Sequence, residues 1–150
     1  MNFILIVAAV IIIDQITKYI VVNKFFLGES IPVIPDIFHW TYILNEGAAF
    51  GMLEGSRWLF VVVALAVSLG IWYFRKEISQ EPLMVRMGAA LFAGGAIGNL
   101  IDRTLHGAVI DFFDFRIWPI FNVADIAICI GVGMILWKIV TAELLEHKNA

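Results

Sequence analysis

Residues 58–74 read WLFVVVALAVSLGIWYF, an uninterrupted run of 17 uncharged residues between Arg57 and Arg75. Three further stretches of the chain are similarly apolar. A helix needs about 20 mostly apolar residues to cross the hydrocarbon core of a bilayer, and in lipid it satisfies its backbone hydrogen bonds within the segment itself. The sequence therefore predicts four transmembrane helices, at about 3–22, 57–74, 85–102 and 120–140.

The composition also indicates a membrane protein. Hydrophobic residues make up 61% of the 150 residues, charged residues make up 15%, and the mean hydropathy is +0.92. The net charge of −3 is unlike that of a nucleic-acid-binding protein. A single cysteine, Cys129, excludes a disulfide framework and a CxxC metal site. We expect one integral membrane domain over residues 1–150, all-α apart from its loops, with no nucleic-acid partner.

Four spans place both termini on the same side of the membrane. The 75–86 loop and the C-terminal end carry five Lys and Arg, whereas the other two connections, counted together with Arg57 at the start of the second span, carry four. Because cytoplasmic loops are richer in basic residues, we predict cytoplasmic termini and extracytoplasmic connections at 23–56 and 103–119. Residues 38–44, FHWTYIL, alternate with aromatic side chains as a β-strand does. A small extracytoplasmic β-structure on the membrane surface is therefore expected.

Polar residues inside the predicted spans share one depth. A charge at the centre of a span costs about 2.5–3.5 kcal/mol on insertion scales, so such residues need an explanation. Since the helices alternate in direction, late residues of the first and third spans and early residues of the fourth all lie near the outer face. They are spaced three or four apart, which puts them on one helix face: Asp14 with Lys18, Asn99 with Asp102 and Arg103, and Asn122 with Asp125.

Asp111 and Asp125 differ from Asp14, Asp102 and Asp114 because neither has a Lys or Arg within four residues. A carboxyl group near the low-dielectric boundary must find a partner or hold a proton. The remaining polar residues also have plain structural interpretations: an Asp14–Lys18 ion pair, an Asp102–Arg103 anchor at the helix end, interhelical hydrogen bonds from Asn99 and Asn122, and an Asp114–Arg116 loop pair.

The chemistry that these residues support is carboxylate chemistry. Cys129 lies in mid-span with no partner in view, no serine stands near a His or Lys in a recognisable arrangement, and no HExxH motif occurs. Two neighbouring aspartates share a proton and can hydrolyse a peptide bond. At this point, proton-coupled transport and a structural assembly module are alternatives to peptide hydrolysis.

Five motifs occur in an order that resembles the bacterial lipoprotein signal peptidase family, signal peptidase II. They are Asp14-Gln15-x-x-Lys18, the run NEGAAFG at 45–51, Gly98-Asn99-x-x-Asp102-Arg103, Val109-Ile110-Asp111-Phe112 and Phe121-Asn122-x-Ala124-Asp125. The resemblance covers residues 14–125. Each motif alone is weakly specific, whereas all five in order are strongly specific.

The resemblance implies a membrane-embedded aspartic endopeptidase of the bacterial cytoplasmic membrane. Its substrates would be diacylglyceryl-prolipoproteins, cut just before the lipidated cysteine. Asp111 and Asp125 match the family's catalytic pair. Asn45 and Arg103 would hold the substrate backbone, and the remaining substrate-binding or surrounding residues would be Asp14, Lys18, Gly47, Asn99, Asp102, Asn122 and Ala124. We expect membrane lipid as a partner, globomycin-type cyclic peptides as inhibitors, a monomer, and neither metal nor cofactor.

Overall fold

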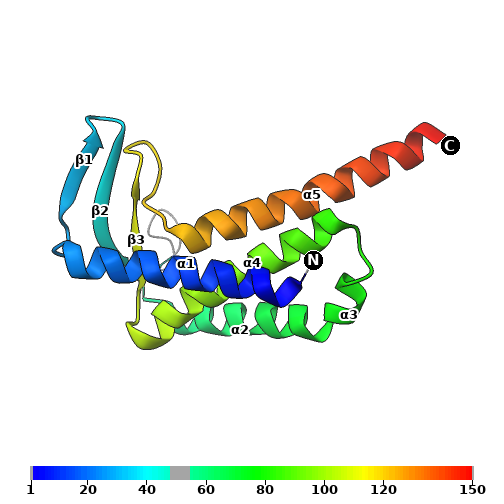
Figure 1. Cartoon of the computed structure of the whole chain (residues 1–150), viewed down its shortest axis with the longest axis horizontal. Coiled ribbons are helices and arrows are strands. Elements are labelled where there is room, and N and C mark those ends of the chain that lie inside the picture. Colours follow the sequence, from blue (N-terminus) through cyan, green and yellow to red (C-terminus); the bar gives the residue numbers. More distant parts are fainter. Residues whose placement is uncertain (1, 48–54, 150) are drawn as a thin grey trace.

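The computed structural model describes residues 2–47 and 55–149. Residues 48–51 of the motif at 45–51 lie outside this described part. The elements follow one another as α1 (Phe3–Lys24), β1 (Ser30–Ile34), β2 (Phe38–Asn45), α2 (Arg57–Tyr73), α3 (Arg75–Ile78), α4 (Leu83–Leu105), β3 (Val109–Asp114) and α5 (Val123–Asn149). The long helices run side by side, and the strands gather at one end of them (Figure 1).

Three helices in the described part of the chain are long and apolar enough to cross a membrane: α1, α4 and the segment Val123–Ala142 of α5. The α2 helix has 17 residues and is shorter than these. Large apolar side chains of the long helices face outward, among them Ile12 at 55% and Leu136 at 54% exposure. This outward apolar surface is that of a protein surrounded by lipid rather than water.

The fourth predicted span begins later than expected. The span was expected from about residue 120, whereas α5 begins at Val123 and Phe121 forms a β-bridge with Phe113. The physical reason is Asn122, whose side-chain oxygen accepts a hydrogen bond of 2.9 Å from the Asp125 backbone N–H and so caps the helix at its first turn. The helix then continues to Asn149, beyond the predicted end at residue 140.

The predicted extracytoplasmic β-structure is a three-stranded antiparallel sheet in the order β1-β2-β3. The third strand comes from the other connection, after α4. A small apolar core joins this sheet to α1: Val21 of α1 packs with Ile110 and Phe112 of β3. The Trp40 ring stacks on Phe112 with ring centroids 5.6 Å apart. The sheet is therefore anchored on the end of α1, and β3 is placed against the helices.

Small residues let α4 lie against two neighbours at once, as the run AGGAIG at 93–98 predicts. A Cβ atom on Gly94 would come within 2.7 Å of Val10 in α1. A Cβ atom on Gly95 would collide with the backbone oxygen of Ala124 and come within 2.8 Å of Ile128 in α5. These close approaches bring the polar ends of α1, α4 and α5 together.

Gly95→Ala is expected to separate α4 from α5 at the level of Asp125. The added methyl group meets backbone, which cannot rotate away, so we expect a loss of about 1–3 kcal/mol of stability and a reduction in any activity that needs both helices. Thermal unfolding in detergent measures the first effect. Gly133→Ala is the matched control, because a Cβ there has no described atom within 4 Å. Equal melting of the two variants would contradict this close-packing account.

Candidate functional site

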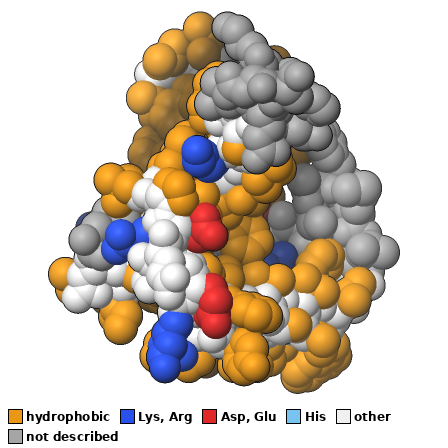
Figure 2. All heavy atoms as spheres, turned by 90° about the vertical axis from the view of Figure 1, so that its right-hand side faces the viewer, with side chains coloured by type: hydrophobic (Ala, Val, Ile, Leu, Met, Phe, Trp, Pro, Cys, Tyr) orange, Lys and Arg blue, Asp and Glu red, His pale blue; other side chains and the backbone are white. Residues whose placement is uncertain are grey.

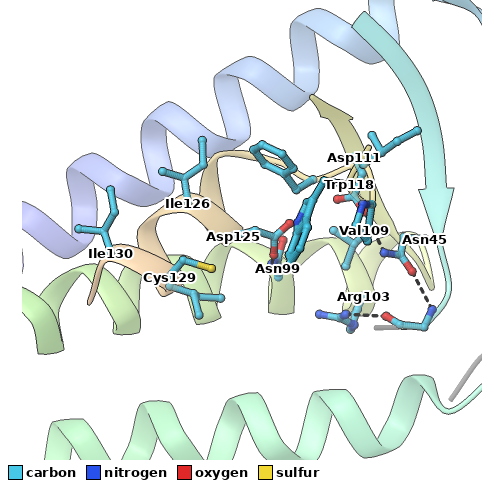
Figure 3. Close-up of a pocket in the computed structure, with 15 residues that line it drawn as sticks. Asn45, Asn99, Arg103, Val109, Asp111, Trp118, Asp125, Ile126, Cys129 and Ile130 are labelled. Atoms are coloured by element: carbon cyan, nitrogen blue, oxygen red, sulfur yellow. Dashed lines mark hydrogen bonds between the residues drawn. The ribbon is translucent and has the colours of Figure 1, made fainter. Parts of the chain in front are cut away.

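The aspartates without a local cation, Asp111 of β3 and Asp125 of α5, line one cavity. Asn45 at the end of β2 and Asn99 of α4 line it as well. Figure 3 shows these four side chains gathered at one end of the cavity. Asp111 is buried at 1% exposure, and Asp125 is half-buried. Residues far apart in the sequence therefore place two carboxyl groups in one cavity.

Asp125 is held by the first turn of its own helix and by α4. Its Oδ2 accepts a hydrogen bond of 3.1 Å from the backbone N–H of Asn122, which in turn caps Asp125, so the two residues form a reciprocal capping box. Its Oδ1 accepts a bond of 2.7 Å from the side-chain amide of Asn99. The carboxyl group is thus oriented by partners on both sides.

Asp111 is held by two asparagine amides. The Nδ2 group of Asn122 donates to its Oδ1 at 2.7 Å, and Nδ2 of Asn45 donates to its Oδ2 at 2.9 Å. Asn122 therefore contacts both aspartates, since its oxygen caps the helix that carries Asp125 while its amide nitrogen reaches Asp111. One side chain fixes the position of the pair.

Lys18 is the centre of a buried charge network behind the aspartates. Its Nζ lies 2.9 Å from Asp14 and 2.7 Å from Asp102, and it donates to Oδ1 of Asn99 at 3.0 Å. The Lys18 side chain is 2% exposed. A buried ammonium with three acceptors is well compensated, whereas removing it would leave two buried carboxylates without their cation.

This network also sets which end of the Asn99 amide faces Asp125. Lys18 has only donors to offer, so the Asn99 oxygen must face it. Asn122 donates to the same oxygen at 3.0 Å. The NH2 end of Asn99 therefore faces Asp125, and it donates a hydrogen bond to the carboxyl oxygen there.

Asp14 and Asp102 also fasten the surrounding backbone. Asp14 accepts from the backbone N–H of Ala124 at 2.9 Å, and Asp102 accepts from that of Ile110 at 3.1 Å. The first bond ties α1 to the start of α5. The second ties α4 to β3, next to Asp111. Both carboxylates therefore position the segments that carry the pair.

The electrostatic environment of Asp111 favours its protonated form. Burial, followed by the charge of Asp125, raises the pKa of Asp111 to about 7, although hydrogen bonds from Asn45 and Asn122 and the charge of Lys18 act to lower it. Near neutral pH the buried pair therefore holds about one proton, which is the arrangement that aspartic hydrolysis requires.

The cavity has a volume of about 430 Å3 and is mainly apolar away from the aspartates. Trp118 and Phe121 line one part of it, and α5 contributes Ile126, Cys129 and Ile130 (Figure 3). These last three residues follow Asp125 along the helix, so the apolar lining extends about 7 Å from the carboxyl group toward the other end of α5. The cavity can accept an apolar group beside a polar one.

Arg103 and Gly47 also line the cavity and contact each other. Arg103 donates to the backbone oxygen of Gly47 at 3.1 Å and lies over the Phe60 ring, with its guanidinium carbon 4.7 Å from the centroid. Gly47 is in turn held by its N–H bond of 3.0 Å to the Asn45 side chain. These contacts connect α4 and α2 with the end of β2 at the cavity mouth.

The structure brings every residue named from the sequence as a candidate into this cavity or the network behind it. Asp14 and Lys18 form their expected ion pair, and Asp114 pairs with Arg116 at 2.8 Å. The interpretation of Asp102 as an anchor beside Arg103 is wrong, because Asp102 is 1% exposed and pairs with Lys18. Its true partner comes from another helix.

Sequence reasoning missed Gln15, Trp118 and Cys129 as candidates for the site. The Gln15 amide bonds Asp102 at 3.0 Å and Asp14 at 3.2 Å, and a polar residue inside a span was the available signal. Trp118 and the exposed Cys129 line the cavity, which no local pattern indicated. Within the described residues, no group of three His, Cys, Asp or Glu side chains suits a metal ion.

One serine and one histidine meet in the sheet, although they form no nucleophilic arrangement. Ser30 Oγ lies 3.1 Å from His39 Nδ1, because β1 pairs with β2 so that Ser30 lies opposite Thr41 and Pro32 opposite His39. Ser30 Oγ is also 2.7 Å from Thr41, whose hydroxyl donates to Asp114 at 2.8 Å. The Ser30 proton therefore points to Thr41, and His39 donates to Ser30 instead of activating it as a nucleophile.

Comparisons with known proteins agree on one family. A model of the family described as Signal peptidase (SPase) II matches residues 6–141. A lipoprotein signal peptidase of Desulfitobacterium hafniense is 45% identical over 138 residues, 91% of each chain. One of Halothermothrix orenii is 46% identical over 89% of this chain and 94% of its own. A solved bacterial membrane enzyme superimposes with a TM-score of 0.85 at 38% identity, covering 98% of this chain and 90% of the other.

Proposed function

The chain belongs to the signal peptidase II family, and we propose that it is a membrane-embedded aspartic endopeptidase. Its substrates are diacylglyceryl-modified prolipoproteins, which it cuts just before the lipidated cysteine to release the signal peptide. The observation that carries the aspartic mechanism is the placing of Asp111 and Asp125 at one end of a single cavity, each held by asparagine amides.

In this mechanism the pair begins with one proton between the two carboxyl groups. Asp111 is the more deeply buried and holds that proton, while Asp125 is ionised. Asp125 takes a proton from water as the water oxygen attacks the scissile carbonyl carbon, and Asp111 donates its proton to the carbonyl oxygen. As the resulting gem-diol collapses, the C–N bond breaks and the Asp125 proton passes to the leaving amine. One hydroxyl proton of the gem-diol returns to Asp111, which restores the singly protonated pair.

The residues around the pair divide into two roles in this proposal. Asn45, Gly47 and Arg103 at the cavity mouth hold the substrate backbone, since they carry the polar groups nearest the outer side. The others keep the pair and its backbone in position: Asp14, Lys18, Asn99, Asp102, Asn122 and Ala124.

The apolar lining suits a lipidated substrate. Ile126, Cys129 and Ile130 form an apolar wall that starts at Asp125. The residue after the scissile bond carries the diacylglyceryl group, so an apolar wall beside the pair is where that group or the signal peptide would lie. Membrane lipid is the second apolar partner, around the outward-facing side chains of the helices. Globomycin-type inhibitors would occupy the same cavity.

We also propose that α2 is a fourth span. Its 17 residues lie at the lower limit of about 17–25 for a spanning helix. Exposed aromatic residues stand at both of its ends, Trp58 at 68% and Trp72 at 55% exposure, as at the two interfaces of a membrane. The whole chain, 1–150, is then a single four-helix membrane domain.

The proposed orientation has both termini in the cytoplasm of a bacterium and the site near the extracytoplasmic face of the inner membrane. The start of α1, the end of α5 and α3 lie at the end of the molecule away from the sheet (Figure 1). Charged side chains stand among apolar ones on that end (Figure 2), where α3 carries Arg75 and Lys76. The site is complete within one chain, so a monomer is sufficient for activity.

Peptidase activity is expected to fall about tenfold per pH unit above about pH 7. The reason is that Asp111, whose pKa is raised to about 7, loses the proton that it must donate. Rates in detergent between pH 5 and 9 measure this. A rate that stays level to pH 9 would contradict the role of Asp111 as the acid.

The raised pKa of Asp111 also makes the stability of the folded protein depend on pH. The folded pKa of Asp111 lies above its ordinary value of 3.8, so the folded protein binds this proton more tightly than the unfolded chain. The contribution of Asp111 to stability is therefore present below about pH 4 and is lost as the pH rises to about 7.

The function is tested with purified protein in detergent and two forms of one prolipoprotein, with and without diacylglycerol. Cleavage of the lipidated form alone, just before its cysteine, is the expected result. A protease works without two compartments, whereas a proton-coupled transporter does not, so the assay separates these classes. Failure to cut a substrate that a known signal peptidase II cuts would overturn the proposal.

A further inference from the structure

A buried polar cluster in the sheet is not used by the mechanism above. Asp114, at the end of β3, is 3% exposed, and its Oδ2 accepts from Thr41 of β2 and from Arg116, each at 2.8 Å. Its Oδ1 accepts from the Arg116 backbone at 2.9 Å. Burial would raise the pKa of Asp114, but these hydrogen bonds and the Arg116 charge hold it below its ordinary value. Asp114 is therefore a charged, fully bonded acceptor.

The cluster lies where the pairing of β2 with β3 is irregular. On one side, Trp40 pairs with Phe113; on the other, Ile43 pairs with Asp111. Two residues of β2, Thr41 and Tyr42, thus oppose the single residue Phe112, which is a β-bulge. The Tyr42 backbone bonds Glu29 and Gly28 on the β1 side. The Thr41 side chain supplies a bond to β3 at this bulge.

The register of β3 matters because β3 carries Asp111 three residues before Asp114. A slip of one residue would turn the Asp111 side chain to the other face of the sheet. Asp111 would then lose its bonds to Asn45 and Asn122. On its other edge, β3 is bonded to Phe121, next to Asn122. The position of Asp111 relative to Asp125 therefore depends on how β3 is held between β2 and Phe121.

We propose that Thr41 and Asp114 are a positioning pair, in which their hydrogen bond across the bulge sets the register of β3 and so places Asp111 beside Asp125. This inference rests on the proposed function for its catalytic consequence. The register itself is a structural property that is measured without any substrate. Ser30 and His39 extend the cluster toward β1 through the Thr41 hydroxyl, so they support the pair from its far side.

The kinetic test compares Thr41→Val, which removes the hydroxyl at nearly constant volume, with Thr41→Ser, which keeps it. Thr41→Val is expected to lower kcat about tenfold and to leave KM unchanged within about twofold. It is also expected to move the alkaline limb of the pH profile, because a displaced Asp111 would lie in different surroundings. Thr41→Ser and Ser30→Ala are expected to stay within about twofold of wild type. A merely structural loss would reduce activity equally at every pH, and that result would overturn the proposal.

The register is tested independently by cross-linking in a Cys129→Ala background. Leu44 and Ile110 pair across β2 and β3, so Leu44→Cys with Ile110→Cys places two thiols at a separation that suits a disulfide. Oxidation is expected to link them, and adding Thr41→Val is expected to lower the yield at least threefold. An unchanged yield would overturn the register role even if the protein cleaves its substrate, whereas failure of the wild type to cleave would count against the proposed function alone.

Discussion

Asp111→Asn and Asp125→Asn are each expected to lower the rate of prolipoprotein cleavage by at least about 10^3-fold, the scale on which loss of one member of a catalytic unit acts. Each amide keeps the volume of the carboxyl group but neither takes nor supplies the required proton. The measurement is cleavage of the lipidated substrate in detergent. Both single variants and the double variant are expected to be about equally slow, because the two groups act as one unit.

Asp36→Asn is the matched control for this change. Asp36 is exposed in the turn between β1 and β2, where its backbone φ is 60°, a conformation that Asn tolerates well. We expect wild-type activity from it. Thermal unfolding in detergent shows whether the Asp111 and Asp125 variants are folded. A folded Asp125→Asn protein that cleaves at near wild-type rate would show that Asp125 is not in the catalytic pair.

Lys18→Met is expected to have the largest effect on stability, about 3–5 kcal/mol, the range for breaking a buried ion pair from one side. Asp14 and Asp102, at 0% and 1% exposure, would lose the ammonium that lies between them. Asn99 would also lose the contact that turns its NH2 end toward Asp125. Thermal unfolding in detergent measures the loss.

Two further variants make this second prediction specific. Lys24→Met changes the same residue type at the exposed end of α1 and is expected to leave the unfolding temperature nearly unchanged. Adding Asp102→Asn to Lys18→Met is expected to recover part of the loss, because it removes one of the two uncompensated charges. Equal melting of Lys18→Met and Lys24→Met would show that the buried network does not stabilise the helices.

Much of the fold followed from local patterns. The charge-free runs predicted α1 and α4 closely, because span length is set by the thickness of the hydrocarbon core. The alternation of aromatic side chains at 38–44 predicted the strand β2. The helix α5 starts three residues after the expected position of about 120, because Asn122, identified as a polar residue of the span, acts as its helix cap. Capping depends on one side chain, and the hydropathy averaged over a run of neighbouring residues does not reveal it.

The sequence predicted which residues belong to the candidate site, but not which residues of different helices and strands bond one another. Asp111 and Asp125 stood apart because they lack local cations. Spacing also indicated the pairs that lie on one helix, Asp14 with Lys18 and Asn122 with Asp125. The partners from other elements were not predicted, such as Gln15 with Asp102 and Thr41 with Asp114. Their side chains have no spacing rule that links them.

The sequence by itself predicted the apolar spans, the polar residues that lie within them at a cost, and a common depth for those residues. The tertiary structure alone decided that Lys18 bonds Asn99, 81 residues away, and that Asn45 bonds Asp111, 66 residues away. The physical reason is that helix and strand periodicity act only over neighbouring residues, whereas these contacts require α4 to approach α1 and α5 closely. Gly94 and Gly95 permit that approach, and it brings a buried cation and two asparagines to the aspartate pair.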